Sequence, residues 1–562
     1  MPKKVLITSA LPYANGPLHF GHIAGAYLPA DCYVRFQRLI GNDVIYICGS
    51  DEYGIAITLS AEMAGRSPQE HVDKFHKINK FLFEKLNISF DHFSRTTTKE
   101  HIPLVQKFFL DLYNNGFIEE KEKEHLYSEE EDRFLADRYV LGTCPKCGFE
   151  KARGDECPKC AASFDAKDLK NPVSRLSNKP LTLKKSTHWY MRFDKFKDRL
   201  LKWVKDKKWK PNVYHFTLSY IEDLKERAIT RDSAWGVPLP LANTEGKVLY
   251  VWFDAPIGYI SATQDWSNCI NQPDKWKEYW LDKNTKLVNF IGKDNIPFHT
   301  VFFPAMIMGQ NEPYILVDDV PANEFFLLEG RQFSKTDKWY IDLDDFFSKY
   351  SVDQIRYYLA ANAPETSDSE FTWKDFQNKS NSELLGKFGN FIHRILVFAK
   401  KNTEGKAPSI HDMDEVDSAF LKTLEEKAKE SYEAYDHYHL RKASQIFMEL
   451  AHAGNVYFDH KKPWVLAKDE KTKPQMETAI ALCLNCIKTL ALISFPILPD
   501  ACQKIWQMLG QKTVLTNLNW RDILAIPLAI GQQLNQPKIL FQKIEDDQIQ
   551  KELETLKSGK QS

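Results

Sequence analysis

The sequence predicts an α/β domain that is built on a parallel sheet, split by a metal-binding insertion and followed by an all-α helical bundle. Short apolar runs with β-branched residues alternate with helical patterns up to about residue 116 and again from about residue 229. Four cysteines with metal-ligand spacing lie between these two stretches. Beyond Ser382 the apolar residues repeat only at helical spacing, which is typical of a bundle.

The first strand and the helix after it form the first candidate site. Residues 5–7 are a short apolar run of strand length, and residues 12–17 break the chain with proline, asparagine and glycine. The helical pattern that follows places His19 and His22 on one face of its first turn, where free N–H groups favour anions. Gly21 would let a planar ligand lie against the backbone. Taken alone, such a histidine pair is more often a pair of polar surface residues.

Three later segments are also predicted as buried strands: residues 43–48, 248–254 and 288–291. Residues 300–308 have a helical pattern. Asp51 comes soon after the first of these strands, and ligands of open α/β sheets sit beyond the carboxyl ends of strands. Its carboxylate could therefore hold a substrate ammonium group, or it could only cap a loop.

The insertion carries the strongest local motif of the chain. Its two C-x2-C pairs, separated by nine residues, consist of Cys144, Cys147, Cys157 and Cys160. Four thiolates suit tetrahedral Zn²⁺, so we expect one structural zinc ion that stabilises a small module with little core. A redox role for C-x2-C is the alternative, and the presence of two copies argues against it. The six other cysteines are scattered in apolar contexts, and we expect no disulfides.

Size and composition indicate a protein of several domains. The expected divisions are two halves of the α/β domain (1–116 and 229–320), the insertion (117–228), a loop and connector region (321–381), the bundle (382–545) and a charged tail (546–562). The chain has 75 Lys+Arg and 76 Asp+Glu, so its net charge gives no indication of a nucleic-acid partner. Any surface that binds RNA must therefore be a local patch of positive charge.

We expect no membrane span and a cytoplasmic location. No window of 18 uninterrupted apolar residues exists, and the most apolar stretch, residues 479–498, reads as a buried helix. The beginning of the sequence has no apolar core and cleavage site of the kind that signal peptides carry.

A second motif far downstream supports a functional interpretation of the histidine pair. Residues 330–336 form a short polar loop in which Lys335 stands between Ser334 and Thr336. Together with residues 12–22, this loop resembles the two ATP-binding signatures of class I aminoacyl-tRNA synthetases, known as HIGH and KMSKS. Their order and the 312 residues from His22 to Ser334 fit that family. The resemblance implies a Rossmann-like catalytic domain and an α-helical anticodon-binding domain.

More specific motifs are similar to those of the methionyl-tRNA synthetase family. The matching segments are residues 10–16, 142–147, 251–259 and 292–294 with His299, then Asn390 with Arg394, and residues 462–468. The resemblance implies attachment of L-methionine to a tRNA with the anticodon CAU, through a methionyl-adenylate made from ATP. It also implies Mg²⁺ with ATP, and we expect a monomer.

The same resemblance implies the site residues. His19, His22 and Lys335 would be catalytic, and ATP would be bound by His19, Gly21, His22, Asp294, Ser334, Lys335 and Thr336. Methionine would be held by Ala10, Leu11, Tyr13, Asp51, Trp252, Ala255, Pro256, Tyr259 and His299, with Arg231 and Phe303 as further candidates. The anticodon would be read by Asn390, Arg394, Pro463 and Trp464. Without the match, Trp252 and Tyr259 would be read as ordinary core residues.

Two positions depart from the family pattern. Gln332 stands where the signature loop usually has a lysine, and Phe303 stands where many members have a pocket tryptophan. Two other functions therefore stay open at this point: a class I synthetase for another apolar amino acid, and a non-catalytic tRNA-binding paralogue. The insertion is short for an editing domain, and the presence of His19, His22 and Lys335 argues against the paralogue.

Overall fold

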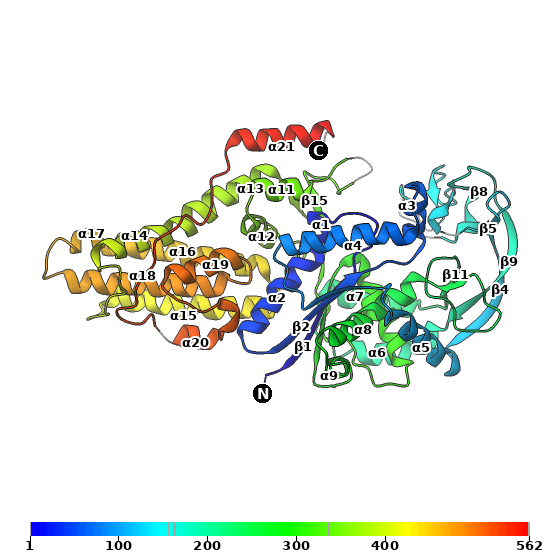
Figure 1. Cartoon of the computed structure of the whole chain (residues 1–562), viewed down its shortest axis with the longest axis horizontal. Coiled ribbons are helices and arrows are strands. Elements are labelled where there is room, and N and C mark those ends of the chain that lie inside the picture. Colours follow the sequence, from blue (N-terminus) through cyan, green and yellow to red (C-terminus); the bar gives the residue numbers. More distant parts are fainter. Residues whose placement is uncertain are drawn as a thin grey trace.

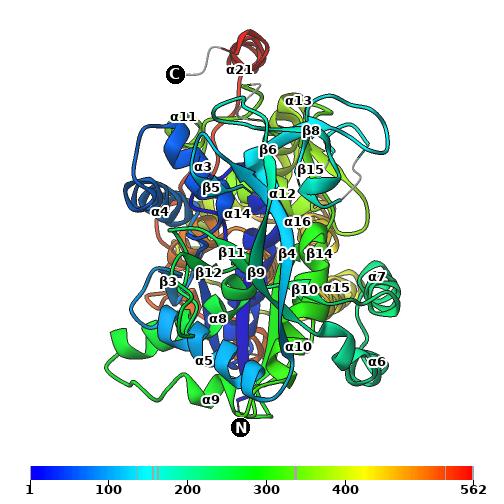
Figure 2. The same cartoon turned by 90° about the vertical axis from the view of Figure 1, so that its right-hand side faces the viewer.

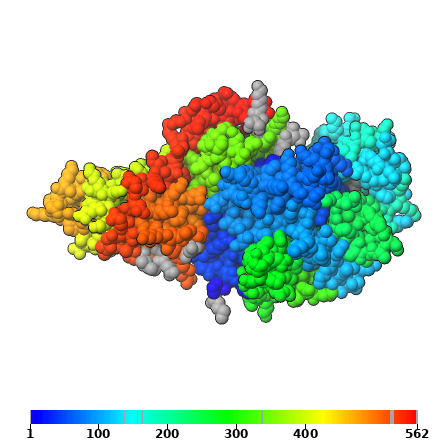
Figure 3. Space-filling view, viewed as in Figure 1, coloured from blue at the N-terminus to red at the C-terminus, as the bar shows by residue number. Residues whose placement is uncertain are grey.

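The computed structural model describes residues 2–135, 137–154, 157–160, 164–334, 338–525 and 527–559. The molecule is elongated, with the helical bundle at one end, the insertion at the other and the parallel sheet between them (Figure 1). The space-filling view shows these parts as one continuous body that narrows toward the tip of the bundle (Figure 3). The predicted fold class is confirmed.

The central sheet has five strands, all parallel, in the order β14-β13-β1-β2-β3. Its strands are β1 (Lys4–Ser9), β2 (Asp43–Ser50), β3 (His92–Arg95), β13 (Lys286–Gly292) and β14 (Ala322–Asn323). The run Val5, Leu6, Ile7 is buried on both faces, as expected for a central parallel strand. The strand order reverses direction between β1 and β13, and such a switch point is where open α/β sheets bind ligands.

Helices cover both faces of the sheet. They are α1 (Phe20–His22), η1 (Ile23–Tyr27), α2 (Leu28–Leu39), α3 (Ile55–Met63), α4 (Pro68–Lys85), α5 (His101–Asn114), α8 (Val251–Cys269), α9 (Lys277–Trp280), η5 (Lys293–Asn295), η6 (Phe298–Phe302) and α10 (Phe303–Met308). The helix predicted after Pro17 is confirmed as α1, η1 and α2 in succession. The η1 segment is π-helical, a distortion that is frequent at functional sites.

The strand predicted at residues 248–254 is wrong. In that region the extended part is β12 (Lys247–Leu249), which pairs with β11 (Thr230–Asp232), and helix α8 begins at Val251. A run of aromatic and β-branched residues does not distinguish a buried strand from a buried helix. Here packing against the central sheet decides, and α8 accommodates Pro256 only five residues after its start.

The insertion contains a separate layer of antiparallel strands, and Figure 2 shows the two longest, β4 and β9, along their length. Its long pair β4 and β9 belongs to the sheet β10-β9-β4-β5, and a smaller sheet β7-β6-β8 carries the first cysteine pair at the end of β6. The elements are β4 (Ile118–Ser128), β5 (Arg133–Phe134), η2 (Asp137–Tyr139), β6 (Val140–Thr143), β7 (Ala152–Arg153), η3 (Ala166–Asp168), β8 (Lys170–Ser174), β9 (Thr182–Met191), η4 (Phe193–Phe196), α6 (Lys197–Val204), α7 (Pro211–Glu222) and β10 (Arg227–Ala228).

The connector joins the sheet to the bundle. Its elements are β15 (Phe326–Leu328), α11 (Leu343–Lys349), α12 (Val352–Ala361), β16 (Ser369–Phe371) and α13 (Trp373–Asn378). The bundle consists of η7 (Lys379–Gly389), α14 (Asn390–Asn402), α15 (Glu415–Asp436), α16 (Leu440–Lys461), α17 (Pro463–Leu466), α18 (Lys473–Ser494), α19 (Pro499–Met508), η8 (Leu515–Asn517) and α20 (Trp520–Ala525).

A buried arginine ties the bundle to the sheet domain. Arg356 of α12 is fully buried; it donates to Asp31 of α2 (2.6 Å) and to the backbone carbonyls of Leu86 and Pro496 (3.1 and 2.9 Å). Burial alone would raise the pKa of Asp31, yet the guanidinium groups of Arg35 and Arg356 hold it below its usual range. Because the guanidinium finds partners in three segments, this contact fixes their relative position.

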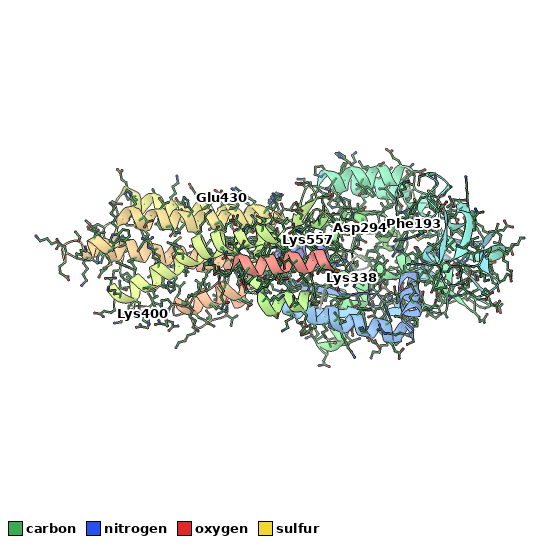
Figure 4. The ribbon with its side chains drawn as sticks, turned by 90° about the horizontal axis from the view of Figure 1, so that it is seen from above. Phe193, Asp294, Lys338, Lys400, Glu430 and Lys557 are labelled. Atoms are coloured by element: carbon green, nitrogen blue, oxygen red, sulfur yellow. The ribbon has the colours of Figure 1, made fainter. Side chains whose placement is uncertain are left out.

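The charged end of the chain is a docked helix rather than a frayed tail. Helix α21 (Asp546–Ser558) buries Ile549 and Leu556, and Glu552 bonds Lys349 of the connector (2.9 Å). Seen from above, Lys557 of this helix lies near Lys338 (Figure 4). The helix therefore crosses back from the bundle to the connector.

Helix α18 (Lys473–Ser494) is the one described helix long and apolar enough to cross a membrane by length and composition. Of its most apolar window, 94% is buried inside the protein, so it forms the core of the bundle, as the sequence predicted.

Candidate functional site

A cleft of about 560 Å³ opens at the switch point of the sheet. Its walls combine residues that follow β1, residues that follow β13, the first turn of α1 and the beginning of the signature loop. Those singled out from the sequence are Ala10, Leu11, Tyr13, His19, Gly21, His22 and Asp294. The topology thus brings together two motifs that lie more than 300 residues apart in the chain.

His19 and His22 are held close together at the start of α1. His19 is the N-cap residue, and its backbone N–H donates to Nδ1 of His22 (3.2 Å). The two imidazole rings stack with centroids 3.7 Å apart. A Cβ at Gly21 would lie 2.9 Å from two ring atoms of His19, so this glycine makes room for the histidine ring.

The signature loop meets the histidines through Phe333. Its ring is parallel to that of His19 within 4°, with centroids 4.5 Å apart. We call Phe333, His19 and His22 the ring stack. Gln332 also lines the cleft, and Ser334 forms a two-way backbone bridge with Trp339. Lys335 and Thr336 lie outside the described residues.

Asp294 lines the same cleft from η5, which follows β13. Its Oδ1 would be 2.8 Å from a Cβ at Gly292, so the glycine lets the carboxylate fold close to the strand end. Burial raises the pKa of Asp294 above its usual value. A carboxylate here is placed to accept hydrogen bonds from hydroxyl groups of a bound ligand.

Tyr259 and His299 form a hydrogen-bonded pair behind the cleft. The Tyr259 hydroxyl lies 2.8 Å from Nε2 of His299, and Nδ1 of His299 lies 2.9 Å from the carbonyl oxygen of Asn295. Burial lowers the pKa of His299 to about 4, so the ring is neutral at pH 7. A neutral ring whose Nδ1–H donates to a carbonyl must accept at Nε2, and the tyrosine hydroxyl therefore donates to it.

Two buried carboxylates lie beneath this pair. Asp51 is 4% exposed and Asp254 is fully buried; Oδ1 of Asp51 and both carboxylate oxygens of Asp254 have no hydrogen-bond partner among the described residues. The imidazole of His101 approaches Asp254, with Nε2 3.8 Å from Oδ2. Burial raises the pKa of both carboxyls, and for Asp51 the nearby Asp254 adds to the effect. Such a site gains from a bound cation.

The other residues predicted for methionine lie along α8 and α10. Trp252 is 40% exposed, and its ring meets Phe298 edge-on at 4.8 Å. Pro256 is buried and Ala255 half-buried in the same helix. Phe303 is buried against Tyr259, with ring centroids 6.3 Å apart.

Arg231 does not line the main cleft. Its guanidinium lies 3.8 Å from the centre of the Tyr250 ring and borders a second cavity of about 200 Å³ that Trp252 also lines. The structure therefore separates Arg231 from the ring stack and places it beside Trp252.

The four insertion cysteines converge. Their sulfur atoms all lie within 4.8 Å of one another, with Cys144 and Cys160 3.8 Å apart and Cys147 and Cys157 3.6 Å apart. Thiolates around a tetrahedral Zn²⁺ with bonds of about 2.3 Å are about 3.8 Å apart. Gly148 takes a left-handed conformation after the first pair, which closes the turn around the site. The donor set and its spacing fit a metal ion.

Two of the predicted anticodon residues, Pro463 and Trp464, belong to α17, which Figure 1 shows at the end of the bundle farthest from the insertion. Lys462 is left-handed (φ 46°) and separates α16 from α17, so Trp464 lies just after a break between two helices. Trp464 is 38% exposed, while Pro463 is buried. The Arg394 guanidinium lies 5.4 Å from the Trp464 ring and pairs with Asp459 (2.6 Å), and exposed Asn390 lies one turn away.

Sequence reasoning missed three residues of the cleft region: Phe333, Asp254 and Arg138. Phe333 is part of the signature loop, so its position could have been noticed, but its contact with His19 could not. Asp254 fell in a segment that was expected to be a strand. Arg138 reaches the cleft from η2 of the insertion, a contact for which the sequence gives no signal.

Comparison with known proteins agrees with this geometry. The sequence model of a family described as "tRNA synthetases class I (M)" matches residues 5–396, and that of the "Anticodon binding domain of methionyl tRNA ligase" matches residues 407–561. A methionine–tRNA ligase of Protochlamydia amoebophila is 59% identical over 98% of this chain and 79% of its own length. One from Chlamydia pneumoniae is 51% identical over 97% of this chain and 100% of its own length.

Solved structures show the same fold. A Mycobacterium tuberculosis methionyl-tRNA synthetase, solved in complex with methionyl-adenylate, superposes with a TM-score of 0.79. The match covers 96% of this chain and 99% of that one at 24% identity. Since two family models together match most of the chain, and relatives above 50% identity match nearly all of it, the chain belongs to the methionine branch of the class I tRNA synthetases, the methionine–tRNA ligases.

Proposed function

We propose that this protein attaches L-methionine to its tRNA in two steps. In the first step the methionine carboxylate attacks the α-phosphorus of ATP, forming methionyl-adenylate and releasing pyrophosphate. In the second step a hydroxyl group of the terminal adenosine of the tRNA attacks the acyl carbon and releases AMP. The observation that carries the proposal is the cleft at the β1/β13 switch point, which is lined by the first signature, by Asp294 and by Gln332 and Phe333 of the second signature.

The chain's own residues act by positioning and by stabilising charge. His19 and His22, held at the start of α1, donate to phosphate oxygens as negative charge moves toward the leaving pyrophosphate. Lys335 neutralises that charge, with Ser334 and Thr336 as further donors of the loop. Asp294 accepts hydrogen bonds from the ribose hydroxyls, and Gly21 keeps the His19 ring close to the backbone. Mg²⁺ accompanies ATP through its phosphates without a dedicated protein cage.

The buried residues behind the cleft select the amino acid. Oδ1 of Asp51 has no hydrogen-bond partner in the described part of the chain, which supports its assignment to the α-ammonium group, since a buried carboxylate oxygen without a donor gains from a bound cation. The backbone of Ala10 and Leu11, which line the cleft, is assigned to the same ammonium group. Tyr13, Trp252, Ala255, Pro256, Tyr259 and His299 then surround the thioether, which favours aromatic contacts, with Phe303 behind Tyr259 and Arg231 beside Trp252.

Zinc is the metal that we assign to the four cysteines, one ion per chain in a structural role. A donor set of four thiolates leaves no open position for a substrate, which supports a structural site. At the other end of the molecule, Trp464 offers a ring on which an anticodon base stacks, with Asn390 and Arg394 bonding base edges and Pro463 fixing the break; CAU is the anticodon we assign. We further propose the domain division given from the sequence, a monomer, and a cytoplasmic location.

The experiment is methionine-dependent exchange of pyrophosphate into ATP on the purified protein, followed by aminoacylation of a tRNA with the anticodon CAU. Exchange should occur with methionine and not with leucine, isoleucine or valine at equal concentration. Exchange with one of those three instead would identify a different class I synthetase. Binding of tRNA without exchange of any amino acid would identify a non-catalytic paralogue. The family membership favours neither alternative.

A further inference from the structure

The His19 ring is confined on three sides. Phe333 covers one face (centroids 4.5 Å apart, planes within 4°), and His22 covers the other (3.7 Å, 27°). Gly21 borders the ring edge so closely that a methyl group there would lie 2.9 Å from Cε1 and Nδ1. His22 is itself fixed, because its Nδ1 accepts from the His19 backbone N–H.

Of these three neighbours, only Phe333 comes from outside the histidine motif. It is carried by the loop after β15, and β15 pairs in parallel with β16 of the connector. Trp339, on the far side of the same loop, bridges back to Ser334 and donates its Nε1–H to the Leu328 carbonyl (2.8 Å), so the described base of the loop is anchored at two points. Phe333 therefore presents its ring from a fixed support.

We infer that Phe333 is a positioning residue for the reaction, because its ring holds the His19 imidazole in the orientation from which it donates to the phosphates. This inference rests on the proposed function of His19. Parallel aromatic rings attract one another beyond the effect of buried area, and the orientation of a donor decides its effect on a transition state. An aliphatic side chain at position 333 would fill the space without fixing the plane of the neighbouring ring.

Three variants separate ring stacking from apolar packing: Phe333→Met, Phe333→Leu and Phe333→Tyr. If stacking matters, the Met and Leu variants should lower kcat of methionine-dependent exchange by roughly 10-fold. This is at the upper end of the effect of one aromatic pair, about 2- to 13-fold, and below that of a 1 Å misplacement, about 100-fold. KM for methionine should stay unchanged, and Phe333→Tyr should keep near-normal kcat. Phe347→Met is the matched control, because Phe347 of α11 is also half-buried, and its ring contact within the described residues is the edge-on one with Phe346.

A second measurement reads the stack without any activity. In protein labelled at the histidine rings, the Cε1–H resonance of His19, assigned by its loss in His19→Asn, should show the upfield displacement caused by a ring above it. That displacement should disappear in Phe333→Met and Phe333→Leu and persist in Phe333→Tyr. Normal kcat in the Met variant, or an unchanged His19 resonance in it, would overturn the inference. If the wild-type protein catalyses no exchange, the proposed function fails, and the spectrum alone decides whether Phe333 holds His19.

Discussion

Replacing Trp464 by alanine tests whether the tip of the bundle reads RNA. The indole is 38% exposed; one side packs on Phe458 (centroids 5.6 Å apart) and the Arg394 guanidinium lies 5.4 Å from the ring. Stacking of one base on an aromatic ring contributes about 1–3 kcal/mol, which corresponds to about 5- to 150-fold in binding. We therefore expect Trp464→Ala to lower kcat/KM of aminoacylation by that factor, mainly through KM for tRNA.

The same variant should leave methionine-dependent exchange nearly intact, because Trp464 belongs to α17, which Figure 1 shows at the end of the bundle far from β1 and α1. Two controls frame the result. Val465→Ala removes part of an exposed neighbour (51% exposed) and should change neither reaction. Trp520→Ala removes a core indole (3% exposed), costs about 3–5 kcal/mol of stability and should affect both reactions together.

The result that would refute the anticodon role is a Trp464→Ala protein that behaves like Trp520→Ala. Its melting temperature would fall, and exchange and aminoacylation would decline in the same proportion. Loss of aminoacylation alone, with unchanged melting temperature, supports a ring that contacts RNA. The Arg394–Asp459 pair adds a second expectation, since Arg394 must leave Asp459 (2.6 Å) before its guanidinium bonds a base edge.

Three further predictions concern the loop, the metal and pH. Lys335→Ala should lower kcat of exchange by roughly 10²–10³-fold with little change in methionine binding, and a near-normal rate would contradict its role; Gln332→Lys should raise the rate or leave it unchanged. Elemental analysis should find one zinc per chain, retained in Cys269→Ala and lost in Cys144→Ser; zinc-free protein would refute the assignment. Because burial lowers the pKa of His299 to about 4, the unfolded chain binds more protons than the folded protein does between pH 6.5 and 4. Stability should therefore fall by up to about 3 kcal/mol as pH drops through that window, and urea titrations of His299→Asn should show a smaller loss.

Local pattern was enough to predict the central strands and the course of the bundle. The runs at Val5, Asp43 and Val288 each have the length and composition of a buried parallel strand, and the structure has β1, β2 and β13 there. The cysteine site could also be predicted from the sequence, because the spacing of the cysteines indicates a metal site. The docking of α21 could not be predicted, since the sequence of a charged amphipathic segment does not identify its packing partner. Ile549 and Leu556 become buried only when the chain folds.

The strand wrongly expected at residues 248–254 also explains why Asp254 was missed. In a strand, alternate residues point to opposite faces, so Asp254 would have belonged with Trp252 and Tyr250. In helix α8, residues three and four apart share a face, which groups Val251, Asp254 and Gly258. The structure shows that face turned toward the loops after β1 and β2: a Cβ at Gly54 would meet Val251 at 3.0 Å, and one at Gly258 would meet Leu11 at 2.9 Å.

Asp254 lies between these two contacts along the helix, so its carboxylate is carried into the layer that also holds Asp51. Burial raises the pKa of Asp51, and the nearby Asp254 adds to that effect. The assignment of secondary structure at residues 248–254 thus decided whether the buried carboxylate of Asp254 was noticed. The sequence left undecided whether this segment follows the period of a strand or that of a helix, because a buried apolar run is compatible with both. The packing of α8 against β2 and β3 selects the helix.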